Sequence, residues 1–298
     1  MSRQWWIVLA SLFVAACGNG EQASQATGEV GSATAELGDA ATATLSPYEL
    51  AVANPARSEA DRLRDGARKP AETLEFFDVA ESMQVLDMFS GGGYYTEVLA
   101  YLVGPKGKVY AQNNQAYLDF AKDELKTRFA DGRLANVERL NIAFADLDLP
   151  ADTIDVALLI LSYHDLYYRP EDDSWPEIDG PAMLFDIYGS LKPGGVLGVI
   201  DHNANPGADK FETATGLHRI DMMVVRCEIE SAGFAFAGSA DLLRNPRDDL
   251  SAPMFAEGIR GKTDRFVLRF HKPIDGSEEG GPSAECENWQ PVEKPQAR

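Results

Sequence analysis

Short apolar runs alternate with amphipathic stretches along the chain from Gln84 onward. Apolar runs bounded by turn residues are typical of buried strands, whereas apolar residues that recur every three or four positions are typical of helices. Regular alternation of the two predicts a parallel, doubly wound α/β sheet. The predicted strands cover residues 85–87, 108–112, 137–143, 154–161, 196–200, 234–237 and 265–271.

Helices are predicted between these strands. One follows a glycine-rich turn near Tyr95, and another begins at Pro181, since proline is favoured at the first helical position. Upstream of the first strand, residues 55–77 have a helical pattern that Pro70 interrupts. The helices between the strands are expected to include residues 95–102, 117–125, 181–191 and 220–232.

The two ends of the chain lack this alternation. Residues 18–46 are rich in Ala, Gly, Thr, Ser and Glu, so they bury too little apolar surface to offset their ordering entropy. We therefore divide the 298 residues into a targeting segment, a flexible tether, a folded domain and a loose C-terminal tail in which Trp289 could dock. These four parts cover residues 1–17, 18–53, 54–273 and 274–298.

The first residues have the pattern of an export signal. Arg3 precedes an apolar run at 5–16, which is too short to span a bilayer comfortably. Small residues then lead to Cys17, and residues 14–17 resemble the lipobox of bacterial lipoproteins, in which the cysteine is acylated. An ordinary signal peptide or a chance apolar N-terminus is the alternative. The lipobox resemblance predicts export to the periplasmic side and a lipid anchor on Cys17, with the outer membrane as the expected location.

The net charge of the chain limits the classes of binding partner that are expected. It has 47 Asp and Glu residues against 27 Lys and Arg, so its formal net charge is −20. Such a surface repels phosphate backbones and anionic lipid headgroups. We therefore expect a small-molecule substrate, no nucleic acid, and no membrane contact beyond the lipid anchor.

Two cysteines remain besides Cys17. Outside the cytoplasm, Cys227 and Cys286 could form a disulfide that stabilises the fold. Alternatively, Cys227 is a buried helix residue and Cys286 a free thiol. We favour unpaired cysteines, because Cys286 lies in the tail that is expected to be loose.

A triple glycine follows the first predicted strand. Strand, glycine turn and helix N-terminus together form a nucleotide-binding cradle, because backbone without side chains can approach a ligand closely. The flanking polar residues follow the same order as the strands. They are Asp87 in strand one, Gly91, Gly92 and Gly93 in the turn, Asn113 after strand two, Asp146 and Leu147 after strand three, and the sequence 191–195 before strand five.

This ordered set resembles the class I S-adenosylmethionine-dependent methyltransferases. It is most similar to a group of exported, predicted methyltransferases, over residues 54–273. The resemblance implies a Rossmann-like, doubly wound, mostly parallel sheet of seven strands with an antiparallel last strand. It also implies S-adenosylmethionine as cofactor and methyl transfer to an unidentified, small-molecule acceptor.

The resemblance assigns cofactor roles to individual residues. The turn 91–93 would hold the methionine part, with Asp87 at the acidic position of strand one. Asn113 stands where the family usually has an acidic residue that binds the ribose hydroxyls. Asp146 would accept the adenine amino group, and Leu147 would offer its backbone amide. Asn113 departs from the family pattern, as does Phe89, which stands where the first glycine of the loop is more frequent.

Histidines mark the carboxyl ends of two strands, where ligands bind in open α/β sheets. His164 and Asp165 follow strand four, and His202 ends strand five. His164 could accept a proton from the substrate, with Asp165 or a neighbour orienting the ring. His202 and His218 are further candidates, and a structural role is the alternative for each. We predict no metal site, because no HxxxH or HxH spacing is present.

Two other functions are compatible with parts of this pattern. A non-catalytic binding lipoprotein would keep the fold without tight cofactor binding, which Phe89 and Asn113 favour. A nicotinamide-dependent oxidoreductase would require G-x-G-x-x-G and an acidic residue at the end of strand two, and neither is present. Arg64, Arg68 and Lys69 could hold an anionic substrate or the cofactor carboxylate, or could belong to a solvated helix face.

Overall fold

The computed structural model of the chain describes residues 44–172, 174–274, 280–287 and 289. The predicted targeting segment with Cys17 lies outside these residues, as does the predicted tether up to residue 43. Within the described residues, no helix combines the length and the apolar character needed to span a membrane.

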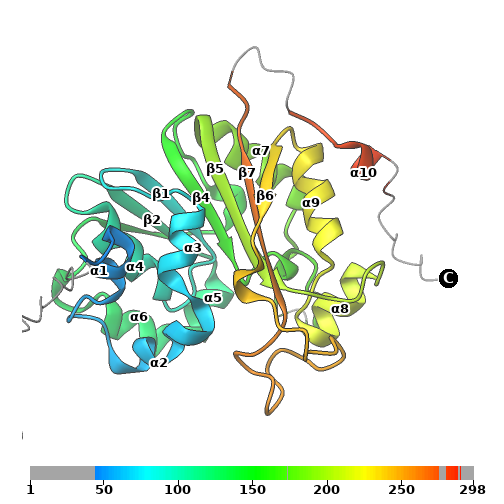
Figure 1. Cartoon of the computed structure of the whole chain (residues 1–298), viewed down its shortest axis with the longest axis horizontal. Coiled ribbons are helices and arrows are strands. Elements are labelled where there is room, and N and C mark those ends of the chain that lie inside the picture. Colours follow the sequence, from blue (N-terminus) through cyan, green and yellow to red (C-terminus); the bar gives the residue numbers. More distant parts are fainter. Residues whose placement is uncertain (1–43, 173, 275–279, 288, 290–298) are drawn as a thin grey trace, which may run out of the picture. The chain divides into compact units, whose positions relative to one another are not determined.

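The described strands form one sheet in the order β3-β2-β1-β4-β5-β7-β6 (Figure 1). Strands β1 to β5 pair in parallel, and β7 runs antiparallel to both β5 and β6. The predicted class I methyltransferase fold is therefore confirmed. The strands are β1 (Gln84–Met88), β2 (Lys108–Asn113), β3 (Val137–Asn141), β4 (Ile154–Ile160), β5 (Leu191–His202), β6 (Ala235–Ser239) and β7 (Arg265–His271).

One face of the sheet is covered by helices from the first part of the chain. These are α1 (Pro47–Val52), α3 (Pro70–Phe76) and α4 (Tyr94–Val103), and α2 (Glu59–Arg68) lies between α1 and α3 in the chain. Leu74 of α3 and Leu99 of α4 pack with Val85, Val156 and Leu158 of the central strands in one buried cluster. The predicted break at Pro70 is confirmed, since this residue begins α3.

Helices from the second half of the chain cover the opposite face. Ile187 and Val225 pack there against Leu159 and Val199 of the central strands in a second cluster. These residues come from α7 (Gly180–Ser190) and α9 (Met222–Ser231), and α8 (Lys210–Leu217) lies before α9 in the chain. Buried clusters on both faces explain why the central strands β4 and β5 contain long apolar runs rather than an alternating pattern.

The helix after β2 differs from its prediction. Instead of one helix through residues 117–125, the structure has α5 (Gln115–Phe120) and α6 (Lys122–Arg128). Ala121 separates them with backbone angles outside the helical range, and Asn114 caps α5 by accepting a hydrogen bond from the Tyr117 amide. Helix α5 packs against β2, and α6 carries Arg128, which reaches the glycine turn.

The folded part begins earlier than predicted. Helix α1 lies within residues 18–53, which the sequence assigns to the tether, so the boundary at residue 54 is wrong. Ser46 and Glu49 form a capping box at its start, and Ala51 is buried. The capping box and the burial of one face stabilise this short helix. The residues before it have the composition of a linker, so the sequence did not indicate a helix here.

The tail is attached to the domain. Cys227 of α9 and Cys286 of α10 (Ala284–Glu287) form a disulfide, so the prediction that they are unpaired is wrong. Trp289 packs against the second cluster, as the sequence suggested it could. The disulfide could not be predicted from the sequence, because the polar residues around Cys286 do not indicate that this segment packs against α9.

Candidate active site

The glycine turn after β1 is held by side chains from the end of β2. Gly91 and Gly93 have φ angles of 56° and 77°, which glycine adopts without steric cost. The Gly91 amide donates to Asn113 Oδ1 at 2.9 Å, and Asn113 Nδ2 donates to Ser90 Oγ and to the Gly91 carbonyl at 3.0 Å. Asn113 is buried, so its amide positions the turn. This role needs both a donor and an acceptor, which an acidic residue would not supply.

Phe89, which stands where a glycine was expected, has a left-handed backbone conformation and a buried ring. Its φ angle of 48° is unusual for a residue with a side chain, and the ring is buried. The ring stacks on Tyr117 of α5 with centroids 5.4 Å apart, while its amide donates to Gln112 Oε1 at 3.2 Å. Phe89 thus connects the turn after β1 with α5.

Asp87, the acidic residue of β1, is buried. Its Oδ2 accepts a hydrogen bond from Thr96 Oγ1 at 2.6 Å. Burial raises the pKa of Asp87 from 3.8 to about 7, and the Thr96 hydrogen bond opposes this increase. Asp87 therefore fastens α4 to β1, next to the turn.

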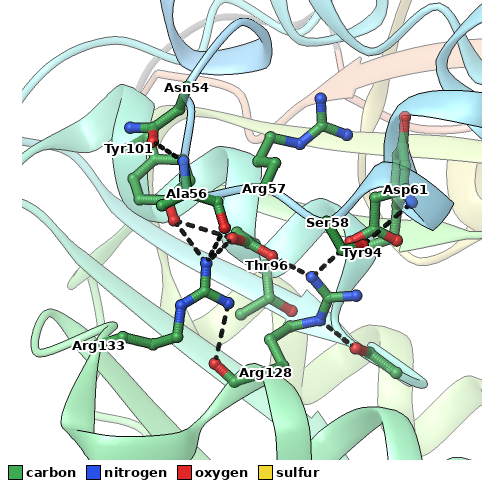
Figure 2. A network of polar contacts seen from close by, with 12 residues as sticks. Asn54, Ala56, Arg57, Ser58, Asp61, Tyr94, Thr96, Tyr101, Arg128 and Arg133 are labelled. Atoms are coloured by element: carbon green, nitrogen blue, oxygen red, sulfur yellow. Dashed lines mark hydrogen bonds and ion pairs between the residues drawn. The ribbon is translucent and has the colours of Figure 1, made fainter.

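A polar network connects helices α2, α4 and α6 (Figure 2). Arg128 donates to the Gly92 carbonyl, to Asp61 at 2.8 Å and to Glu97, which also pairs with Arg133. Burial would raise the pKa of Asp61, but its hydrogen bonds to Arg128 and Arg64 lower it to about 2.

Two of the three glycines leave no space for a side chain, because α6 lies against them. A Cβ atom at Gly92 would lie 1.8 Å from Glu124 Oε2, and one at Gly93 would lie 2.7 Å from Arg128 Cδ. At Gly91 the nearest atom would be the Tyr117 ring at 3.9 Å. Gly91 is therefore the turn residue with room for a ligand beside it.

Of the two residues predicted to bind adenine, only one has a hydrogen-bonding group that is not already used within the protein. Asp146 ends the short helix η2 (Phe144–Asp146) and is exposed, and its carboxylate has no hydrogen-bond partner among the described residues. The Leu147 amide donates to the Phe144 carbonyl at 2.9 Å. The predicted backbone donor is thus used within its own turn, whereas Asp146 has its acceptor oxygens available.

His164 is positioned by Asp201 of β5. Its ring Nδ1 lies 2.8 Å from Asp201 Oδ1, and its backbone amide donates to Asp201 Oδ2 at 2.8 Å. Burial alone would lower the pKa of His164, but the carboxylates of Asp201 and Asp165 outweigh burial and raise it to about 9. The ring is then protonated at neutral pH, which does not suit the predicted role of general base.

Asp165 lies on the other side of the His164 ring. Its Oδ1 is 3.4 Å from His164 Nε2, and its Oδ2 accepts a hydrogen bond from the Tyr117 hydroxyl at 2.5 Å. Both residues belong to η3 (His164–Leu166), directly after β4. Asp201, which orients His164, was not predicted from the sequence. Its position at the end of β5, a strand adjacent to β4, was the available signal.

Two further histidine rings lie close to His164. The His202 ring centroid is 6.0 Å from that of His164, and the His218 centroid is 5.4 Å away. His202 is buried with its Nδ1 2.6 Å from Thr263 Oγ1, and burial together with nearby positive charges lowers its pKa well below 6.5. Burial is the main cause that lowers the pKa of His218 to about 4, and the charge on His164 adds to it. The structure therefore brings together all three histidines that the sequence considered.

Two polar side chains, one directly after β4 and one at the end of α2, make no hydrogen bond to the described residues. Ser162 Oγ is buried without a hydrogen bond. The Arg68 guanidinium lies 4.7 Å from the Tyr94 ring centroid and 5.9 Å from that of Tyr95, with no carboxylate within ion-pair distance. Arg64, in contrast, pairs with Asp61.

Comparison with known sequences agrees with the fold. Residues 61–146 match the model of the protein-L-isoaspartate(D-aspartate) O-methyltransferase family, a segment that extends from α2 to η2. It contains the glycine turn and Asp146. The chain thus has the strand order of the class I methyltransferase fold, and residues 61–146 are similar to one methyltransferase family. Among curated proteins, no sequence matches the chain significantly.

Solved methyltransferase structures are similar at low identity. A SAM-dependent methyltransferase from Aquifex aeolicus is 20% identical, with a TM-score of 0.49 over 76% of this chain and 99% of that chain. An arsenic(III) S-adenosylmethionine methyltransferase from Chlamydomonas reinhardtii is 16% identical, with a TM-score of 0.46 over 80% and 77% of the two chains. At these scores the fold assignment rests on the strand order.

Proposed function

We propose that the chain transfers the methyl group of S-adenosylmethionine to a small-molecule acceptor at the carboxyl ends of β1 and β4. The strand order reverses between these two strands, which is where open α/β sheets bind ligands. The observation that carries the proposal is the connection made there by Tyr117, which contacts Phe89 after β1 and Asp165 after β4.

The residues present fit the cofactor at several points. Gly91 leaves room beside the turn, and the exposed Asp146 can accept from the adenine amino group. Arg68 is a cation without a carboxylate partner among the described residues, which suits the cofactor's carboxylate. Ser162 Oγ is a buried polar atom without a partner at the end of β4, where a ligand could satisfy it.

The role of the protein is mainly to bind and orient. When bound, S-adenosylmethionine supplies an electrophilic methyl group on a sulfonium. His164, which Asp201 holds in place, would orient the acceptor rather than remove its proton. This arrangement favours acceptors that are already nucleophilic, for which proximity and orientation supply most of the acceleration.

A second candidate function is a binding protein that retains the fold without catalysis. The specific observation in its favour is that Asn113 and the Leu147 amide, both predicted cofactor ligands, make hydrogen bonds within the protein. Such a protein would bind a ligand at the strand ends without releasing a demethylated product.

We also propose that the chain acts on the periplasmic side, anchored through Cys17. Support comes from the lipobox-like residues 14–17 and from the Cys227–Cys286 disulfide, since disulfides persist in oxidising compartments. Replacement of Cys17 by Ser should release the protein from membranes or leave an unprocessed precursor. Equal membrane association of both forms after fractionation would contradict the anchor.

Calorimetric titration of the full-length chain tests the proposed function. S-adenosylmethionine and its product S-adenosylhomocysteine should each bind at one site per chain, while NAD should not bind. Tight binding of NAD alone would favour an oxidoreductase. Absence of binding by all three compounds would favour the non-catalytic candidate.

A further inference from the structure

Three potential metal ligands meet beside the strand ends. Within the described residues, His164, Asp165 and His218 each place one ligand atom within 4.8 Å of the other two. His164 and Asp165 come directly after β4, whereas His218 follows α8. The fold therefore assembles this group from two segments that are distant in the sequence, which is why no linear spacing revealed it.

The distance between the first two ligand atoms suits a shared ion. His164 Nε2 and Asp165 Oδ1 are 3.4 Å apart, longer than a good N–H···O hydrogen bond. Two ligands on a tetrahedral Zn²⁺ at 2.0–2.1 Å are themselves about 3.4 Å apart. These atoms thus face each other at the separation expected of ligands on one ion.

The opposite atoms of both ligands are already bound. Asp201 Oδ1 holds His164 Nδ1 at 2.8 Å, which leaves Nε2 directed toward Asp165. A bound ion would displace the proton that Nε2 carries in the absence of the ion. Tyr117 donates to Asp165 Oδ2 at 2.5 Å, which leaves Oδ1 directed toward His164. In metal sites a carboxylate usually binds the other ring nitrogen of a ligating histidine, because this fixes the ring and increases its basicity.

His218 can complete the set. Its ring contacts His164, Tyr168 and Phe255, and makes no hydrogen bond with the described residues. The side chain is half-buried, and Phe255 beside it is 45% exposed. A shift of roughly 1–1.5 Å would bring a His218 nitrogen from the 4.8 Å limit to ligand separation.

We propose that His164 Nε2, Asp165 Oδ1 and a ring nitrogen of His218 bind a divalent ion of the zinc class. Two imidazoles and one carboxylate match the three-ligand sets of catalytic zinc sites, which leave a fourth position open. At that position the ion would bind an oxygen or sulfur of a small molecule and lower its pKa. The metal site does not depend on the proposed methyl transfer.

Zinc titration of the full-length chain, free of affinity tags and treated with a chelator beforehand, tests the site. Calorimetry should show one Zn²⁺ bound per chain. His218→Ala and Asp165→Asn should each weaken binding by at least about 100-fold, because removal of even an outer-shell partner costs 10–100-fold. Asp165→Asn retains the shape of the side chain and an acceptor for Tyr117, so it separates loss of the ligand from loss of folding.

His271→Ala is the matched control, since this histidine lies in β7, outside the group of three. It should leave zinc affinity unchanged, and Tyr117→Phe should weaken binding by about 10-fold through the outer shell. Wild-type protein that binds no zinc would overturn the proposal. Zinc binding that is equal in wild type, His218→Ala and Asp165→Asn would also overturn it, because binding would then be adventitious.

Discussion

The hydroxyl group of Tyr117 donates a hydrogen bond to Asp165 Oδ2 across 2.5 Å. Tyr117 belongs to α5, which follows β2, and Asp165 belongs to η3, which follows β4. The Tyr117 ring also stacks on Phe89, after β1. One side chain therefore connects the ends of three strands, and it joins the half of the site assigned to the cofactor with the half that contains the histidines.

Removal of this hydroxyl should destabilise the protein. In Tyr117→Phe, Asp165 loses a buried hydrogen bond to a charged group, and we expect the free energy of unfolding to decrease by about 1–3 kcal/mol. Tyr168→Phe is the control, because the Tyr168 hydroxyl makes no hydrogen bond with the described residues. Urea unfolding measures both, and an equal effect of the two substitutions would contradict the importance of this contact.

The buried Asp87 predicts a pH dependence of stability. Its pKa is raised from 3.8 to about 7, so its contribution to stability is fully present below pH 3.8 and is lost as the pH rises to 7. Asp87→Asn remains neutral and avoids this loss. The variant should therefore gain a few kcal/mol relative to wild type between pH 4 and pH 8, since each pKa unit corresponds to about 1.4 kcal/mol. A difference in unfolding free energy that is equal at both pH values would show that the pKa of Asp87 is not raised.

Asn113→Asp separates the ribose-binding role from the structural one. A carboxylate here would lose both donors to Ser90 and Gly91 and would face the Gly91 carbonyl. We expect a loss of about 1–3 kcal/mol in unfolding free energy. Asn114→Asp should be neutral, because Asp and Asn cap helix α5 equally well. If Asn113→Asp is stable and binds S-adenosylhomocysteine more tightly, Asn113 faces the ribose instead.

The disulfide predicts sensitivity to reductants. Cys227 and Cys286 close a loop with a sequence separation of 59, so reduction should lower the unfolding free energy by about 2–5 kcal/mol. Thermal unfolding with and without dithiothreitol measures this loss. In a Cys227→Ser, Cys286→Ser double variant the reductant should have no effect. A wild-type protein insensitive to dithiothreitol would contradict the bond.

The fold was predictable because its signals are local. Apolar runs such as 85–87 and 154–161 locate the strands, and the glycine turn marks the change from a strand to a helix. The alternation of strands and helices along the chain therefore follows from the sequence. The start of helix α4 and the break at Pro70 were also visible. Helix α1 was missed because its stabilisation comes from one capping box and packing, not from a long apolar period.

The site was predictable only in part. The sequence placed His164 and Asp165 after β4, since strand ends can be located from the pattern. Which carboxylate holds His164 depends on the pairing of β4 with β5, which brings Asp201 into contact. The approach of His218 likewise depends on how the segment after α8 packs. Such pairings are set by tertiary structure and leave no fixed spacing in the sequence.

Affinity for S-adenosylhomocysteine tests the central claim most directly. In Asp146→Ala the adenine amino group would lose its acceptor, so calorimetry should show binding weaker by about five- to a hundred-fold, equivalent to 1–3 kcal/mol. Asp148→Ala removes a second exposed carboxylate two residues away and should leave the affinity unchanged. Equal affinity of wild type, Asp146→Ala and Asp148→Ala, or no binding by the wild type, would contradict a cofactor site at the ends of β1 and β4.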